Sequence, residues 1–502
     1  MELTMQKPLV RGAGVLLPVS ALPSPYGIGT FGKTAYHFVD FLRRAGQRYW
    51  QILPLCPTGY GDSPYQSVSA FAGNPYFIDL DMIVSQGLLK KEDIEAYTWG
   101  NKKTEIDYSR QYNNRYLILR QAFKNSDCAG DKKYIKFIKE NKIWLDEYAL
   151  FMAIKDSQNG APFSKWPEDL RMRESSALKK ARADLSEDIN FHLFLQYHFF
   201  SQWEKLKAYA GKNGVSIIGD IPIYVAGDSA DVWEYHDQFQ LDESRMPTRV
   251  AGVPPDIFSE DGQLWGNPLY DWDKMKLDDF KWWQRRMEMC ARLYDIIRID
   301  HFIGIVNYYS IDAAEETAKN GKWIKGPGAD LLKAIVEAVG EKKIIAEDLG
   351  SVTQKVRSLM KKFGFPGMKI LQYAFDGNPG NDNLPHNYTN NMVVYGGTHD
   401  NEPLASFVSG QPRGRRRFAE QYLDVKSCRL LPRAIIRAGY ASCADAAVFQ
   451  MQDYLELHKD SRMNIPSTLG GNWTWRMRYA QMDSSLAQRM RQMAEMYSRI
   501  EN

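Results

Sequence analysis

Eight short runs of apolar, mostly β-branched residues recur along the chain, and each one stops at polar or charged residues. Continuous apolar runs of this kind are typical of strands that are buried on both faces of a parallel sheet. Segments with helical periodicity lie between several of the runs, which predicts an α/β fold. The runs cover residues 14–20, 49–55, 216–223, 296–302, 343–350, 367–375, 391–400 and 446–455. The helical segments are 33–46, 280–294, 329–340 and 353–364.

The number and the ends of these runs favour a (β/α)8 TIM barrel over a doubly wound open sheet. Eight runs match the eight strands of such a barrel, and no G-x-G-x-x-G motif follows the first run. The later runs end in carboxylates or histidine. Because active sites of these barrels lie at the carboxyl ends of the strands, the polar ends predict an active site at the barrel mouth.

The spacing of the runs is uneven, which predicts large insertions in a single catalytic domain over residues 1–502. About 160 residues separate the second and third runs. Within them, residues 85–190 are polar, lysine-rich and helix-like, and we expect an inserted helical subdomain there. Residues 224–272 are rich in Gly, Pro, Asp and Trp, and we expect an inserted loop region that covers the substrate. A loop so long and aromatic is expected to be functional rather than disordered.

Charge and cysteine usage exclude several classes of protein. A net charge of +3 is close to balance, so no nucleic-acid or membrane partner is expected. The sequence contains no run of about 18 apolar residues, so no membrane-spanning helix is expected. The cysteines are odd in number and scattered, which fits a reducing, cytoplasmic location without disulfides. No H-E-x-x-H, Walker A or G-x-S-x-G motif occurs, so no metal or other cofactor is expected. The five cysteines are Cys56, Cys128, Cys290, Cys428 and Cys443.

The fourth run ends in Arg298 and Asp300. Residues i and i+2 of a strand face the same way, so both side chains are expected to point into the barrel. A guanidinium favours the ionised form of a neighbouring carboxyl, and an ionised, positioned Asp is what a nucleophile requires. A purely structural ion pair at a strand end is an equally open interpretation.

The fifth run ends in Glu347 and Asp348, of which only one can point inward. Glu347 follows Ile344, Ile345 and Ala346. A carboxyl group in such an apolar site has a raised pKa and can act as a general acid. Asp348 is expected to cap the next helix instead.

The seventh run ends in His399, Asp400 and Asn401. His399 is expected to donate to a substrate hydroxyl, and Asp400 to accept from two. Three acidic strand ends on one barrel predict a glycosidase-type mechanism with two working carboxylates and a helper.

Several long motifs give the chain a family resemblance. It resembles the amylomaltase (disproportionating) type of 4-α-glucanotransferase, glycoside hydrolase family 77, from about residue 10 to about residue 480. That family implies a barrel without a separate C-terminal β-sandwich. The motifs are residues 24–32, 61–80, 219–233, 250–272, 298–302, 346–350, 367–375, 397–401 and 462–476.

The resemblance implies a role for each of the acidic strand ends. Asp300 matches the family nucleophile and Glu347 the acid/base. Asp400 matches the carboxylate that stabilises the transition state, and Arg298 and His399 match the supporting residues around these three carboxylates. These roles agree with those argued from the strand ends alone.

The resemblance also implies substrate-binding residues. Tyr65 and Asp220 match sugar-binding positions near the cleaved bond, and Trp265 lies in the substrate-covering loop. Asn464 matches the late loop that contacts the glucan. Trp473, in the same late segment, is expected either to contact glucan or simply to pack.

The implied activity is transfer of α-1,4-glucan segments to the 4-OH of glucose or another glucan by a retaining double displacement. Maltooligosaccharides and other α-1,4-glucans are the expected partners, and the expected state is a monomer or a homodimer. An α-1,4-glucan hydrolase of the α-amylase type is the main alternative, because both share the glycosyl-enzyme intermediate. A catalytically inactive glucan-binding protein is less favoured, since all three carboxylates are present.

Overall fold

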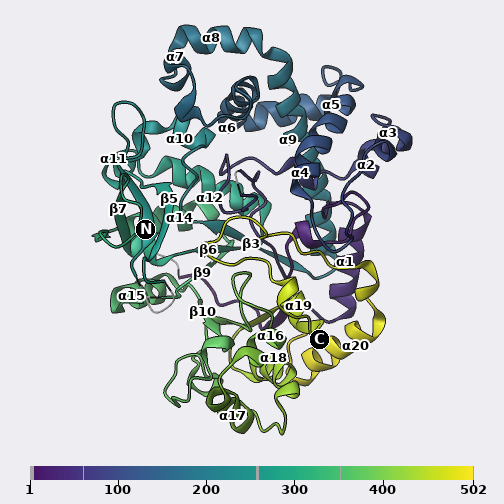
Figure 1. Ribbon diagram of the computed structural model, residues 1–502, viewed down its shortest axis with the longest axis vertical. Helices are drawn as coiled ribbons and strands as arrows, with labels where there is room; N and C mark the ends of the chain where they lie inside the picture. The colour runs from purple at the N-terminus through teal and green to yellow at the C-terminus, as the bar shows by residue number, and fades with distance from the viewer. Residues whose placement is uncertain (1–4, 60, 256–258, 351, 501–502) are drawn as a thin grey trace.

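A parallel strand forms at each of the eight predicted runs. The structure, a computed structural model, describes residues 5–59, 61–255, 259–350 and 352–500 (Figure 1). Most of the predicted runs continue past their strands, so their polar ends lie in the loops that follow. The strands are β1 (Gly12–Leu16), β2 (Tyr49–Gln51), β3 (Ser216–Pro222), β6 (Ile296–Asp300), β9 (Lys343–Ala346), β10 (Gly367–Ile370), β11 (Met392–Tyr395) and β12 (Ala446–Gln450).

These strands close into a barrel, as predicted. Their order is β10-β11-β12-β1-β2-β3-β6-β9, and all the pairings between them are parallel. The seam between β9 and β10 is completed by the Ala346 N–H, which donates to the Pro366 carbonyl at 3.0 Å. Beside it, the Met368 N–H donates to the Asp348 carboxylate at 2.7 Å.

Helices surround the barrel, and four of them lie where helical periodicity predicted them. Between β10 and β11 the chain forms only 3-10 turns, so the helical layer is incomplete there. The four predicted helices are α1 (Lys33–Arg44), α12 (Lys281–Leu293), α14 (Ala329–Val339) and α15 (Gln354–Phe363). The later ones are α16 (Leu404–Gly410), α17 (Arg413–Tyr422), α18 (Leu431–Ala441), α19 (Met451–Tyr454) and α20 (Ser484–Met496).

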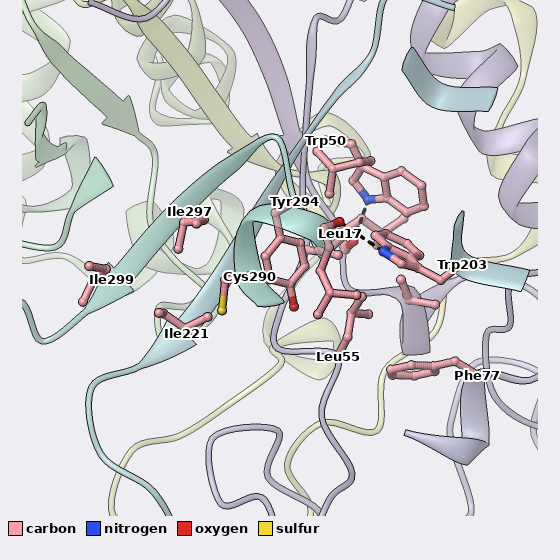
Figure 2. Close-up of a cluster of buried hydrophobic side chains, with 14 of the residues drawn as sticks. Leu17, Trp50, Leu55, Phe77, Trp203, Ile221, Cys290, Tyr294, Ile297 and Ile299 are labelled. Atoms are coloured by element: carbon pink, nitrogen blue, oxygen red, sulfur yellow. Dashed lines mark hydrogen bonds between the residues drawn. The ribbon is translucent and has the colours of Figure 1, made fainter. Parts of the chain in front are cut away.

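Alternate residues of each strand face two separate cores. Inward-facing residues such as Ile218, Ile296 and Ile345 fill the barrel interior. Outward-facing residues pack against the helices, and Figure 2 shows part of that layer around Trp50 and Trp203. Both indole N–H groups donate to backbone carbonyls, those of Leu17 and Leu293 respectively. Burying a tryptophan without such a partner for its N–H is costly.

A helical insertion separates β2 from β3 and forms the upper part of Figure 1. Buried glutamines of its last helix anchor the loop that follows β2. The Gln196 amide exchanges hydrogen bonds with the backbone of Gly73, and the Gln202 amide does so with Asp79. The helices are α2 (Leu80–Ser85), α3 (Lys91–Glu95), α4 (Tyr108–Arg110), α5 (Tyr116–Lys124), α6 (Lys132–Ser157), α7 (Glu168–Arg171), α8 (Ser175–Asp184) and α9 (Ser186–Lys212).

The segment 224–272, expected to be a loop, contributes a short helix, α10 (Ala230–Glu234), and two strands. These strands join a separate antiparallel sheet in the order β5-β4-β7-β8. Residues 256–258 of the segment lie outside the described residues. The strands are β4 (Arg249–Val253), β5 (Gln263–Pro268), β7 (Asn307–Asp312) and β8 (Lys322–Lys325). Two more short helices accompany them, α11 (Trp272–Leu277) and α13 (Ile303–Val306).

The buried Arg499 fastens the barrel where its first and last strands meet. Its guanidinium donates to the Gly12 carbonyl at the start of β1 and to the Asp445 carbonyl just before β12. It also donates to the carbonyls of Gly439, Tyr440 and Ser442 at the end of α18. In the described part of the chain, no helix is both long and apolar enough to cross a membrane.

Candidate active site

The alternation that fills the barrel interior also places the charged residues at its mouth. Ile218 faces inward, so Asp220 two positions later faces inward as well. In the same way, Ile296 leads to Arg298 and Asp300 on β6. The register sets Asp220 beside Arg298 across the β3–β6 pair.

Arg298 is the centre of this charged group. Its Nη1 lies 2.6 Å from both carboxylate oxygens of Asp220 and 2.9 Å from Oδ1 of Asp300. Asp220 is completely buried, whereas the Asp300 side chain is about one-third exposed. The guanidinium therefore holds the Asp300 carboxylate in place while leaving it accessible, which suits a nucleophile.

Glu347 lies next to this group, immediately after β9. Its backbone N–H donates to the Ile299 carbonyl of β6, and its carbonyl accepts from the Phe302 N–H in the turn after β6. One carboxyl oxygen accepts from the His301 N–H and the other from the Leu349 N–H, each at 2.7 Å.

The environment of Glu347 suits a general acid. Burial, together with the nearby negative charge of Asp300, raises the pKa of Glu347 to about 8, although Arg298 and the two backbone donors oppose this shift. The carboxyl group therefore keeps its proton at neutral pH.

Asp348 does not cap the following helix, contrary to expectation. Its carboxylate accepts the Met368 N–H across the barrel seam. The cap of α15 is Thr353, whose hydroxyl accepts from the Val356 N–H. The Met368 N–H of β10 takes the Asp348 carboxylate as its acceptor, and this contact between residues 20 positions apart is not visible in the local sequence.

Asp400 lies on another side of the mouth, after β11. Its Oδ1 accepts from the Asn464 amide at 2.6 Å and lies 3.5 Å from Nε2 of His399. Arg462, to which sequence reasoning gave no role, donates to the backbone carbonyl of Asp400. The late segment therefore holds this carboxylate from outside the barrel.

Tyr65 connects the two charged groups. Its hydroxyl donates to Asp220 at 2.9 Å and lies 3.4 Å from Nδ1 of His399. The Tyr65 and His399 rings are stacked with centroids 5.0 Å apart, and Trp473 lies within 6 Å of both. Burial first, and then the charge of Asp220, raises the pKa of Tyr65, so its hydroxyl stays protonated and can donate.

Trp265 reaches the site from β5 rather than from a loop. Its ring lies perpendicular to that of His301, with centroids 4.8 Å apart. His301 was missed as a functional candidate, and its place directly after Asp300 was the signal that could have found it. Among the described residues, no cluster of His, Cys, Asp and Glu could hold a metal ion.

Comparisons with known proteins agree with this geometry. Residues 17–482 match the profile of glycoside hydrolase family 77, described as 4-alpha-glucanotransferase. The chain is 47% identical to a 4-alpha-glucanotransferase of Clostridium butyricum over 486 residues, which cover 96% of this chain and all of the relative. The chain belongs to the 4-alpha-glucanotransferase family.

Other members of the family extend the likeness to the fold. The 4-alpha-glucanotransferase of Thermus thermophilus is 44% identical over 98% of this chain and its own full length. The structure of amylomaltase from Streptococcus agalactiae in complex with acarbose matches with a TM-score of 0.95 at 40% identity, over 98% of this chain and all of that one. The fold is thus a TIM barrel with insertions. The chain is an enzyme that transfers α-glucan segments, and membership argues against the hydrolase alternative.

In this family member, the nine residues predicted from sequence lie at one end of the barrel. Seven of them form one connected network of hydrogen bonds, ion pairs and close polar contacts. Glu347 and Trp265 join it through His301, from the backbone N–H and the ring respectively. Their individual roles stay predictions. The seven are Tyr65, Asp220, Arg298, Asp300, His399, Asp400 and Asn464.

Proposed function

We propose that this 4-alpha-glucanotransferase moves α-1,4-glucan segments from a donor chain to the 4-OH of glucose or another glucan by a retaining double displacement. The observation that carries the mechanism is the pairing of a buried Glu347, whose raised pKa favours the protonated form, with an Arg298-held Asp300 at the ends of neighbouring strands. One carboxyl is prepared to give a proton, and the other is held to attack.

In the first step, an Asp300 oxygen attacks the anomeric carbon of the donor sugar. The bond from that carbon to the leaving glucan oxygen breaks, and Glu347 transfers its proton to that oxygen. In the second step, ionised Glu347 takes the proton of the incoming 4-OH. The acceptor oxygen then attacks the anomeric carbon, and the bond to Asp300 breaks.

The remaining predicted residues act on the substrate in two ways. Asp400, held by Asn464 and His399, is directed at hydroxyl groups of the sugar at the cleaved bond. Asp220 is fully buried and bound by Arg298 and Tyr65, so we propose that it acts on the sugar through these two residues. This indirect role refines the sugar contact expected from sequence.

Transfer requires that a sugar hydroxyl outcompete water at about 55 M, which favours an acceptor site that is oriented and dry. The strand β5 with Trp265 supports such a cover at one side of the mouth. We therefore keep residues 224–272 as the substrate-covering region and residues 85–190 as a helical subdomain of one catalytic domain.

Incubation with maltotriose tests the proposed function. Transfer predicts glucose and longer oligosaccharides while the total number of reducing ends stays constant. Reducing ends that rise in step with maltotriose loss, without longer products, would overturn it. The Asp300→Asn variant is the control, and product formation must fall with it.

The proposal also covers the location, the partners and the oligomeric state of the protein. The reduced cysteines support a cytoplasmic location, and neither nucleic acid nor membrane is an expected partner. A monomer or a homodimer is expected, and light scattering coupled to size exclusion distinguishes the two.

A further inference from the structure

Backbone amides hold both oxygens of the Glu347 carboxyl group. Oε2 accepts from the His301 N–H and Oε1 from the Leu349 N–H. Two N–H donors favour the ionised carboxylate, because a protonated oxygen accepts a hydrogen bond poorly. The acid step, however, needs the proton on Glu347. One of the two bonds must therefore loosen when Glu347 is protonated and tighten when it ionises.

Of these two hydrogen bonds, the one from the His301 N–H comes from a residue whose side chain contacts another element, the strand β5. The His301 backbone has φ of +51°, in the left-handed region that residues other than glycine seldom adopt. Its ring is fixed between Trp265, perpendicular at 4.8 Å, and Tyr224 at 6.5 Å. Burial lowers the pKa of His301 to about 4, so the ring is neutral at working pH and its contacts are those of an aromatic surface.

Space around the ring is limited. A β-carbon at Gly304 would lie 3.1 Å from Cδ2 of His301, so the backbone of α13 leaves little room on that side. The contacts with α13 and with Trp265 therefore limit how far the ring can rotate independently of the His301 backbone.

Trp265 lies on a strand that is held by a neighbouring strand on one side only. β5 is an edge strand of the four-stranded sheet and pairs only with β4. That pairing has a register irregularity between Val250 and Gly252. The Trp265 indole N–H donates to the Gln263 side chain of its own strand, so that bond moves with β5.

We propose that His301 is a positioning residue that couples the seating of a glucan against Trp265 to the hydrogen bond on Oε2 of Glu347. A sugar that displaces Trp265 changes the packing of the His301 ring and with it the aim of the His301 N–H. The proton then leaves or enters Glu347 with substrate in place. This inference rests on the proposed function of Glu347 as acid/base.

A double-mutant cycle between Trp265→Ala and His301→Asn tests the coupling. Asn tolerates left-handed backbone, so the variant removes the ring contact and keeps the N–H. We expect each single change to lower kcat for maltotriose disproportionation about tenfold. The kcat of the double variant should lie within about twofold of that of the less active single variant, because both changes break the same coupling between Trp265 and Glu347.

The pH profile and a conservative variant separate coupling from a merely structural effect. Loss of a well-aimed N–H donor raises the pKa of a carboxyl. Both single variants should therefore shift the alkaline limb of kcat/KM to higher pH. His301→Phe keeps an aromatic surface against Trp265 and should retain kcat within about threefold of the parent enzyme.

Trp473 provides the matched control, because it is an aromatic residue of the site that contacts Tyr65 and His399 instead. Trp473→Ala combined with His301→Asn should be additive. Additive losses for the Trp265–His301 pair, or an unshifted alkaline limb in Trp265→Ala, would overturn the coupling even if His301→Asn folds poorly. A parent enzyme that makes no longer products from maltotriose would instead reject the proposed function.

Discussion

At the scale of single residues, Arg298 organises the site because one guanidinium serves two carboxylates of different exposure. The Asp220 bond is buried, whereas Asp300 faces the mouth. Removing one partner of a buried ion pair leaves an uncompensated charge in a poorly solvated place.

We therefore expect Asp220→Ala to lower the free energy of unfolding by roughly 3–5 kcal/mol. Asp300→Ala should cost clearly less, because the Asp300 carboxylate is partly exposed and water can take its place beside Arg298. Urea unfolding followed by tryptophan fluorescence measures both. Equal losses of stability would contradict this account of Arg298.

The raised pKa of Glu347 predicts the alkaline side of the activity profile. Its general acid works in the protonated form, and a pKa of about 8 keeps that form dominant up to about pH 8. We expect kcat/KM to fall as pH rises beyond that value. Glu347→Gln should lower kcat/KM by roughly 10²–10⁴-fold and abolish this limb. An identical limb in the Gln variant would assign it to another group.

The sequence predicted single residues well where a local rule applied and poorly where a distant partner decided. Arg298 and Asp300 share a face because strand periodicity governs both. Asp348 was predicted to cap a helix, but its carboxylate instead accepts the Met368 N–H where β9 and β10 meet. His301 depends on a ring contact with β5, about 36 positions earlier, which no local pattern indicates.

At the scale of elements, β3 positions Asp220 by packing its outward face tightly. A β-carbon at Gly219 would lie 2.1 Å from the Tyr294 ring. Gly219→Ala should therefore displace β3 and cost roughly 1–3 kcal/mol of stability. Because Asp220 is the next residue, activity should fall as well.

Gly211 is the matched control for that substitution. A β-carbon there meets nothing within 4 Å, and the residue lies in α9. Gly211→Ala should be neutral or stabilise by about 0.5–1 kcal/mol. Thermal melting compares the two variants, and equal effects would contradict the packing argument.

The strand β5 should influence the fate of the glycosyl-enzyme intermediate. Removing the Trp265 ring opens one side of the mouth, so water gains access to the anomeric carbon. We expect Trp265→Ala to raise the fraction of maltotriose that is hydrolysed rather than transferred. The measurement is reducing-end release per maltotriose consumed. An unchanged ratio of reducing ends released to maltotriose consumed would show that β5 does not help to exclude water from the intermediate.

Elements were predictable where the apolar pattern was long. All eight barrel strands and four helices appeared near their predicted positions, because burial on both faces leaves a clear signal. The four-stranded sheet was missed. Its strand β8 is short and exposed along its whole length, and β4 pairs with β7 about 60 residues away. Neither property leaves a local pattern.

At the scale of the whole molecule, the five cysteines differ in accessibility. Burial raises the pKa of Cys56 to about 12 and that of Cys290 to about 11, so these thiols stay protonated and unreactive. Cys443 is exposed. With a thiol reagent, Cys443 of the folded protein should react much faster than the buried Cys290, and all five thiols should react in guanidinium. A fast reaction at Cys290 would contradict the packing around α12.

The position of Arg499 between β1 and β12 has a consequence for folding during synthesis. β1 is synthesised first, yet its partner β12 follows about 430 residues later. At 5–20 residues per second, that edge of β1 waits roughly 20–90 s on the ribosome. The backbone groups of this nascent edge are open to pairing with other chains during that time. Pairing with β12 ends this exposure, and the Arg499 hydrogen bonds to Gly12 and Asp445 stabilise the closed barrel.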